Sequence, residues 1–173
     1  MLKQIKMVSV CVLLSCLLAS CSHSTANDSE LDGKSIVGET LLGEVSAEKL
    51  FAQYPAFQAE YKAYKPSKEE LAAVAELEKD TLLVLFGTWC HDSQREVPRL
   101  LKTFDLSGLD VPKLTLVAVD TKKTDPQGIA QKYNLKYTPT FILLHDDKEL
   151  GRVVERPKTS LTQDLKSLAK ATQ

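Results

Sequence analysis

Two short apolar runs constrain the fold of this 173-residue chain more than any other feature of its sequence. Residues 81–86 and 113–119 consist mostly of aliphatic and aromatic side chains, and each run has the length of one strand. Continuous apolar runs of this length are typical of strands that are buried on both faces of a sheet. A helical stretch at 90–104 separates the two runs.

The region after the second run completes the pattern. We expect a helix around 126–133, an antiparallel hairpin of strands 140–145 and 149–155, and a C-terminal helix that a capping box at 160–163 opens. The order βαβα followed by ββα predicts an α/β fold, with a mixed central sheet flanked by helices on both faces.

Helical patterns also precede the first apolar run. An amphipathic pattern extends from Ser46 to about Tyr64, and Pro55 is expected to kink or divide it. A capping box at 67–70 then opens a helix that continues to about residue 79. We therefore expect a helical extension over residues 44–65, followed by a domain over residues 66–173.

The N-terminal residues 1–20 have the layout of a secretory signal. Two lysines precede an apolar run at 7–19 that is too short to span a bilayer comfortably. The run ends Leu-Ala-Ser-Cys, which resembles the bacterial lipobox and implies that Cys21 is acylated. The alternative is a plain signal peptide that happens to contain cysteines.

Residues 21–43 begin with small polar side chains and are expected to be a flexible tether behind the acylated cysteine. This predicts an exported protein, anchored to the cell envelope by lipid. In a host with two membranes, Ser22 in place of an aspartate predicts the outer membrane, facing the periplasm. His23 lies alone in the tether and is given no metal role.

The cysteines divide by position. Cys11 and Cys16 leave with the signal, Cys21 is blocked by acylation, and only Cys90 remains as a thiol. A mature monomer therefore forms no internal disulfide, even in an oxidising compartment. Such a thiol is either buried and inert or reactive.

Four features of the sequence together point to a family. Residues 89–93, Trp-Cys-His-Asp-Ser, stand where the first buried strand ends and a helix begins, and Pro98 follows eight residues after the cysteine. Residues 137–140, Tyr-Thr-Pro-Thr, precede the third strand, and Gly151 lies in the last one. In this order and context the sequence resembles the thioredoxin family over roughly residues 67–170. The resemblance implies a thioredoxin-like fold.

The resemblance also assigns roles to these residues. Cys90 at a helix N-terminus is the nucleophile, because free backbone N–H groups and the helix dipole favour a thiolate. Trp89 shields one side of the sulfur. A cis peptide before Pro139 lets Thr138 present its backbone to an extended substrate. The alternative for Thr138-Pro139 is an ordinary loop proline.

Two positions depart from the family pattern. Ser93 replaces the second, resolving cysteine, so the usual dithiol cycle is closed, although the hydroxyl can still donate a hydrogen bond to the Cys90 thiolate. Val84 stands where the family has a buried acid that assists resolution. Both departures are consistent with a monothiol (Cys-x-x-Ser) relative.

The two residues inside the motif have opposite electrostatic effects. His91 as an imidazolium would favour the thiolate, while Asp92 would disfavour it. The plainer alternatives are a solvated histidine and a first-turn acid of the helix. Arg95 is placed to offset Asp92, or equally to pair with Glu96 or solvent.

The leading hypothesis is an envelope thiol–disulfide oxidoreductase or isomerase-like protein that acts through one nucleophilic cysteine. Its expected partners are client proteins with disulfides or oxidised cysteines, an external thiol or reductase, and the membrane through the lipid anchor. No metal or cofactor is expected. A net charge of −1 without a basic patch argues against nucleic acid. The alternative is a binding module without turnover, which holds extended peptides or partner proteins at the membrane surface.

Overall fold

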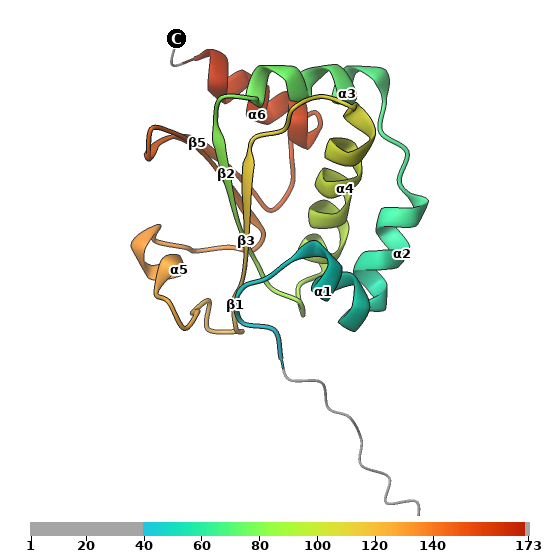
Figure 1. The fold of residues 1–173 in the computed structure, drawn as a ribbon. Helices are drawn as coiled ribbons and strands as arrows, with labels where there is room; N and C mark the ends of the chain where they lie inside the picture. Colours follow the sequence, from blue (N-terminus) through green and yellow to red (C-terminus); the bar gives the residue numbers. More distant parts are fainter. Residues whose placement is uncertain (1–39, 172–173) are drawn as a thin grey trace, which may run out of the picture. The chain divides into compact units, whose positions relative to one another are not determined.

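The computed structural model describes residues 40–171. Figure 1 shows a central sheet with helices packed around it. The elements are, in chain order, β1 (Gly43–Glu44), α1 (Ala47–Gln53), α2 (Pro55–Ala63), α3 (Lys68–Ala73), the 3₁₀ turn η1 (Val74–Leu77), β2 (Thr81–Phe86), α4 (His91–Ser107), β3 (Lys113–Ala118), α5 (Ile129–Lys132), β4 (Thr140–His145), β5 (Lys148–Val154) and α6 (Leu161–Lys170).

The sheet has the strand order β1-β3-β2-β4-β5. The central strand β2 pairs in parallel with β3, with Thr81 opposite Lys113, and antiparallel with β4, with Thr81 opposite Leu144. The hairpin of β4 and β5 and the short strand β1 add further antiparallel pairs. The mixed sheet expected from the sequence is confirmed.

Both faces of the central strands are buried, and the side chains alternate between two hydrophobic clusters. On β2, Leu82, Val84 and Phe86 face α1, α2, η1, α4 and α6, whereas Leu83 and Leu85 face α5. This period of two is the geometry of a strand, and burial on both sides explains why the run contains no polar residue after Thr81.

The two N-terminal helices belong to the same core. As expected, the helical pattern is divided at Pro55, which starts α2, while Ser46 caps α1 by accepting from the Lys49 N–H at 3.1 Å. Phe57 on α2 is fully buried, and its ring centroid lies 5.9 Å from that of Phe86 on β2. The extension over 44–65 is therefore not a separate layer from the domain over 66–173.

The expected end of the tether at residue 43 is wrong. Leu41 is buried in the main cluster, and Gly43 pairs with Ala118 in the two-residue strand β1. A strand this short carries no alternation that a sequence pattern can detect. The earlier part of the tether, the signal, Cys21 and His23 lie outside the described residues.

The two predicted capping boxes have different outcomes. The first is confirmed: Ser67 Oγ accepts from the Glu70 N–H at 3.2 Å, and Glu70 accepts from the Ser67 N–H at 2.9 Å. Its helix changes to 3₁₀ geometry at η1.

The second capping box is wrong, because Ser160 makes no capping hydrogen bond and its Oγ is buried without a partner within residues 40–171. Asp164 instead accepts from the N–H groups of Lys158 and Thr159, which fixes the loop before α6.

Within residues 40–171, no helix combines the length and the apolar character needed to cross a membrane.

Candidate functional site

Cys90 lies at the junction of the central strand and the longest of the described helices. It is the N-cap residue of α4, its N–H donates to the Gly87 carbonyl at 3.0 Å, and its carbonyl accepts from the Gln94 N–H at 2.9 Å. The thiol is half-buried. Because β2 runs directly into this turn, the rigid core of the sheet holds the sulfur at the open N-terminal end of a helix.

The loop before β4 brings a second part of the chain to the thiol. The peptide between Thr138 and Pro139 is cis, as expected. The Cys90 Sγ donates to the Thr138 carbonyl at 3.0 Å, although the two residues are 48 positions apart. The predicted proximity of Thr138 and the sulfur is therefore confirmed.

Trp89 precedes the thiol in the chain and is 43% exposed. Its Nε1 donates to the carbonyl of Val119, at the end of β3, at 3.3 Å. The ring packs over Gly87 so closely that a Cβ there would lie 2.6 Å from a ring carbon. Only glycine leaves room for this ring position, so Gly87 and Trp89 form one structural unit.

Two exposed apolar residues beside the cis-proline loop were not assigned a role from the sequence. Tyr137, next to Thr138, is 57% exposed, and Val154, which is paired with Thr140 across β4 and β5, is 38% exposed. Tyr137 could have been found from the sequence, because it directly precedes the Thr138-Pro139 motif. Val154 could not, because only the pairing of β4 with β5 places it opposite Thr140.

The structure gives Ser93 a different partner from the one expected. Its side chain is fully buried, and its Oγ accepts from the Gly87 N–H at 3.2 Å. It makes no hydrogen bond to Cys90 within residues 40–171. Position 84 is fully buried and holds a valine, so the site has no buried carboxylate there.

Asp92 is held by two arginines. Its Oδ1 lies 2.9 Å from Arg95 Nη2 and 3.0 Å from Arg156 Nε. Arg95 also donates through Nε to Glu96 at 2.6 Å, so both acidic partners considered for it are present. Partial burial lowers the pKa of Arg95, but the hydrogen bonds and charges of Glu96 and Asp92 outweigh it and raise the pKa overall. His91 is exposed, and the described part of the chain offers it no hydrogen bond.

The loop after β5 contacts both the cis-proline loop and the first turn of α4. The Glu155 N–H donates to the Pro139 carbonyl at 2.8 Å, and the next residue, Arg156, reaches Asp92. The start of α4, the cis-proline loop and the β5–α6 loop thus hold one another in place. Arg156 was not predicted because 64 positions separate it from Asp92.

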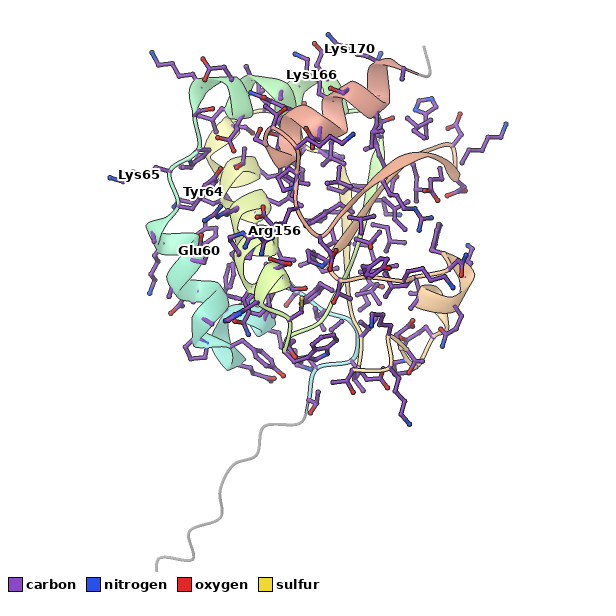
Figure 2. All side chains as sticks on the ribbon, turned by 180° about the vertical axis from the view of Figure 1, so that it is seen from behind. Glu60, Tyr64, Lys65, Arg156, Lys166 and Lys170 are labelled. Carbon is purple, nitrogen blue, oxygen red and sulfur yellow. The ribbon has the colours of Figure 1, made fainter. Side chains whose placement is uncertain are left out.

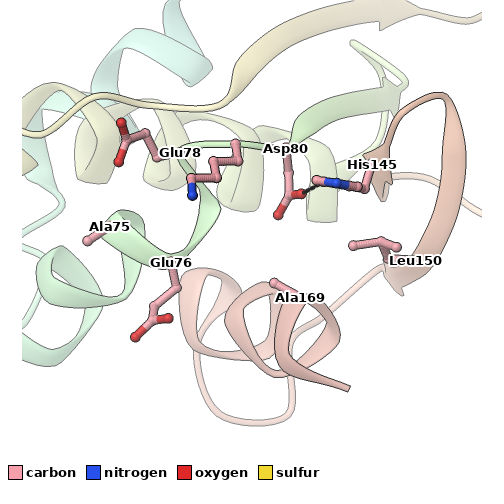
Figure 3. A pocket seen from close by; sticks show the side chains of 8 residues that line it. Ala75, Glu76, Glu78, Asp80, His145, Leu150 and Ala169 are labelled. Atoms are coloured by element: carbon pink, nitrogen blue, oxygen red, sulfur yellow. Dashed lines mark hydrogen bonds and ion pairs between the residues drawn. The ribbon is translucent and has the colours of Figure 1, made fainter. Parts of the chain in front are cut away.

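A cavity of ≈ 300 Å³ lies at the other end of β2, away from Cys90, and is not part of this site (Figure 3). There His145 Nδ1 lies 2.9 Å from the Oδ1 of the buried Asp80, the residue before β2. His145 was expected to be a surface residue at a strand end, and its side chain is half exposed. No group of three or more metal-ligating side chains occurs within residues 40–171.

A thiol at the first turn of a helix, opposite a cis-proline and at the end of a central strand in a mixed sheet, defines the thioredoxin-like class of fold. The model of the thioredoxin family matches residues 64–167, more than half of the 173 residues. The chain belongs to the thioredoxin family.

Individual relatives are more distant. The chain is 32% identical over 91 residues to thioredoxin Y, a chloroplastic protein of Oryza sativa subsp. japonica, covering 52% of this chain and 51% of that protein. It is 30% identical over 76 residues to thioredoxin-2 of Pyricularia oryzae, covering 44% and 41%. The chain thus spans about half the length, or less, of these curated relatives. A solved structure of a protein of unknown function from Pseudomonas aeruginosa is similar at 17% identity and a TM-score of 0.48, over 74% of this chain and 88% of that one.

Proposed function

We propose that this protein is a monothiol thiol–disulfide oxidoreductase or isomerase-like protein that acts through Cys90. The observation that carries the proposal is the position of the sulfur, at the N-terminus of α4 and 3.0 Å from the carbonyl of Thr138 beside a cis-proline. Family membership supports redox chemistry of the thioredoxin type. Trp89, Thr138 and Pro139 form the substrate-binding surface.

The reaction is an exchange of disulfides. The thiolate of Cys90 attacks one sulfur of a client disulfide, a bond forms between the two sulfurs, and the other client sulfur leaves with the electron pair and takes a proton from water. A client sulfenic acid reacts in the same way, with loss of water. An extended client segment aligns along the backbone of Thr138, which holds its sulfur beside the nucleophile.

Release requires a second thiol from outside the protein. Ser93 stands one helical turn from Cys90 and has no sulfur with which to attack the mixed disulfide. An external thiol or a reductase therefore attacks the client sulfur and frees Cys90. The buried Val84 is consistent with this cycle, because no internal resolution step needs a proton acceptor.

We further propose that the mature protein is a bacterial lipoprotein, exported and acylated at Cys21. The support is the lysine-containing start, the apolar run at 7–19 and the Leu-Ala-Ser-Cys sequence that follows it. Two or more acyl chains anchor a protein stably without a spanning helix. Clients would then be other proteins of the cell envelope.

The other candidate is a binding module in which Cys90 performs no turnover. The exposed side chains of Trp89 and Tyr137, which adjoin Cys90 and Thr138 in the sequence, favour it, because they could hold a peptide without any reaction at the sulfur. The two hypotheses differ in one property, whether Cys90 enters mixed disulfides.

Ser93→Cys tests the proposal. Wild-type protein isolated with free thiols blocked should carry disulfide-linked clients or a small thiol on Cys90, and should reduce insulin poorly. Ser93→Cys should deplete these adducts and raise insulin reduction by roughly tenfold or more, because an internal thiol acts at a high effective concentration. The gain in insulin reduction should be smaller than in a family member that has a buried acid where this chain has Val84, because no acid is present to assist the proton transfer.

Two controls complete the experiment. Cys90→Ser combined with Ser93→Cys keeps a thiol in the site but removes the nucleophile, and it should carry no adducts. If wild-type Cys90 stays free of adducts under oxidising conditions and alkylates no faster than a model thiol, the redox proposal fails and the binding module takes its place.

A further inference from the structure

Arg156 is the exposed end of a charged network beside the thiol. The network runs from Arg156 to Asp92, Arg95 and Glu96. The Arg156 side chain is 69% exposed, whereas those of Asp92 and Glu96 are 19% and 6% exposed. Arg156 is therefore the member of the network that is most accessible to solvent.

The bonding of Arg156 leaves a pair of donors unused. It donates to Asp92 through Nε, and no partner of Nη1 or Nη2 occurs within residues 40–171. A planar guanidinium that is fixed at one nitrogen presents its remaining N–H groups in a geometry that matches a carboxylate. The Arg156–Asp92 contact positions the guanidinium beside the active-site turn, and because the arginine is largely exposed, the ion pair itself adds little to the free energy of unfolding.

Arg156 lines a cavity together with His91 and Asp92 of the first turn of α4. It has a volume of ≈ 380 Å³ and is lined by Ala56, Glu60, His91, Asp92, Gln94, Arg95 and Arg156. Glu60 and Gln94 are already engaged, by Arg99 Nε at 2.6 Å and the Thr88 carbonyl at 3.0 Å. Arg156 and the exposed His91 remain as unoccupied donors at the mouth of this cavity.

We propose that this cavity binds a carboxylate, so that the preferred substrates of Cys90 are disulfides with a carboxylate close to the S–S bond. This inference rests on the proposed redox function. The carboxylate pairs with Arg156 while the Cys90 thiolate attacks the nearer sulfur, the old S–S bond breaks, and the departing thiolate takes a proton from water. The carboxylate belongs either to a small acidic thiol or to an acidic residue of a client polypeptide.

Charge-matched disulfides test this preference. The reduced mature protein is mixed with dithiodipropionate, bis(2-hydroxyethyl) disulfide or cystamine, which are anionic, neutral and cationic, and intact mass spectrometry follows mixed-disulfide formation on Cys90. After division by the rates of a model thiol, the anionic reagent should react roughly fivefold faster than the neutral one, and the cationic reagent slowest. The advantage should shrink as salt is raised to about 0.5 M.

Matched variants assign the preference to Arg156. Arg156→Gln should abolish it, and Arg156→Lys should retain part of it, because the charge remains without the planar fork. Lys65→Gln removes one charge from a side chain that points away from the body of the protein, and should leave the preference unchanged (Figure 2). Glu155→Gln removes the exposed acid next to Arg156 and should increase it.

The outcomes separate this inference from the function on which it rests. If Cys90 reacts with the neutral disulfide but shows no dependence on substrate charge or on Arg156, the carboxylate site is refuted and the redox proposal stands. If Cys90 reacts with none of the reagents, both fail. In a second arm, two peptide disulfides that differ only by Glu or Gln near the cysteine are compared. Dependence on Arg156 in the peptides alone indicates a polypeptide client, and dependence in the small disulfides alone indicates a small acidic thiol.

Discussion

Ser93 illustrates how one residue acquires a structural role where its family has a chemical one. Its Oγ is the acceptor for the N–H of Gly87, in the turn that also carries Trp89 and leads into Cys90. The contact is buried, so no water can replace a lost partner. Losing the hydroxyl therefore affects the free energy of unfolding as well as the position of the active-site turn.

Ser93→Ala should lower the free energy of unfolding by about 1–2 kcal/mol, because it leaves the buried Gly87 N–H without an acceptor. Urea denaturation measures the change. Ser167→Ala, which removes an exposed hydroxyl on α6, is the matched control and should change the same quantity by less than about 0.5 kcal/mol. Equal effects of the two substitutions would contradict a structural role for Ser93.

The site residues that sequence reasoning reached are those whose signals are local. Trp89 and Cys90 are neighbours at the end of an apolar run, and Thr138-Pro139 directly precedes another, so each can be placed from a short window. Arg156 cannot be placed from a short window, because the packing of the β5–α6 loop against the cis-proline loop brings it to Asp92, which is 64 positions away in the sequence. The Ser93 hydroxyl was assigned to Cys90 from sequence spacing, whereas the three-dimensional turn gives it to Gly87.

At the scale of elements, α2 is attached to α4 by both apolar and polar contacts. Tyr61 on α2 donates its phenol O–H to Asp105 on α4 at 2.6 Å, and Lys102 Nζ lies 4.5 Å from the centre of the same ring. The hydrogen bond to Asp105, then partial burial and the charge of Asp105, raise the pKa of Tyr61 from 10.0 to about 12. A neighbouring tyrosine, Tyr64, has its pKa raised further, first by burial and then by its hydrogen bond to Glu70.

The raised pKa of Tyr61 makes the attachment of α2 sensitive to alkaline pH. The folded state holds the phenol proton more tightly than the unfolded state, so the stabilisation is complete below pH 10.0 and is lost as pH rises toward 12. Wild-type protein should therefore lose more stability than Tyr61→Phe across this range, and the difference between their free energies of unfolding should be flat below it. Asp105→Asn keeps an acceptor without the charge and should lie between them. A constant difference from pH 8 to 12 would refute the coupling.

Element boundaries were predictable where one residue type decides the backbone. Pro55 fixes the break between α1 and α2, and Ser67 with Glu70 fixes the start of α3. The start of α6 after Ser160 was predicted on the same reasoning, but Ser160 makes no capping hydrogen bond, and Asp164 accepts from the N–H groups of Lys158 and Thr159 ahead of the helix. Sequence patterns therefore locate these helices well and identify the bonds at their ends less well.

At the scale of the whole molecule, residues 40–171 form one core to which the N-terminal helices contribute. Leu50 on α1 and Phe57 on α2 are completely buried, and each such side chain contributes about 1.5–3 kcal/mol when removed from water. The family model begins at residue 64, so these helices lie outside the residues that it matches, yet they contribute side chains to the hydrophobic core. Their aromatic residues, noted in the sequence as core or packing surface, belong to this core and its margin.

The separation between this core and Cys21 gives the last prediction, which concerns location. Cys21 precedes Leu41, the first buried apolar residue within residues 40–171, so replacing it should alter membrane attachment and leave the domain intact. Wild-type protein should fractionate with membranes and carry an acylated Cys21 in mass spectrometry, because two or more acyl chains anchor a protein stably without a spanning helix. Cys21→Ala should abolish acylation and move the protein out of the membrane fraction, with urea denaturation unchanged.

The control is Cys90→Ser, which removes the only other cysteine after residue 20. This variant should stay with the membrane. An unmodified N-terminus at Ser22 or later would refute lipid anchoring, and the clients of Cys90 would then have to be sought away from the membrane surface.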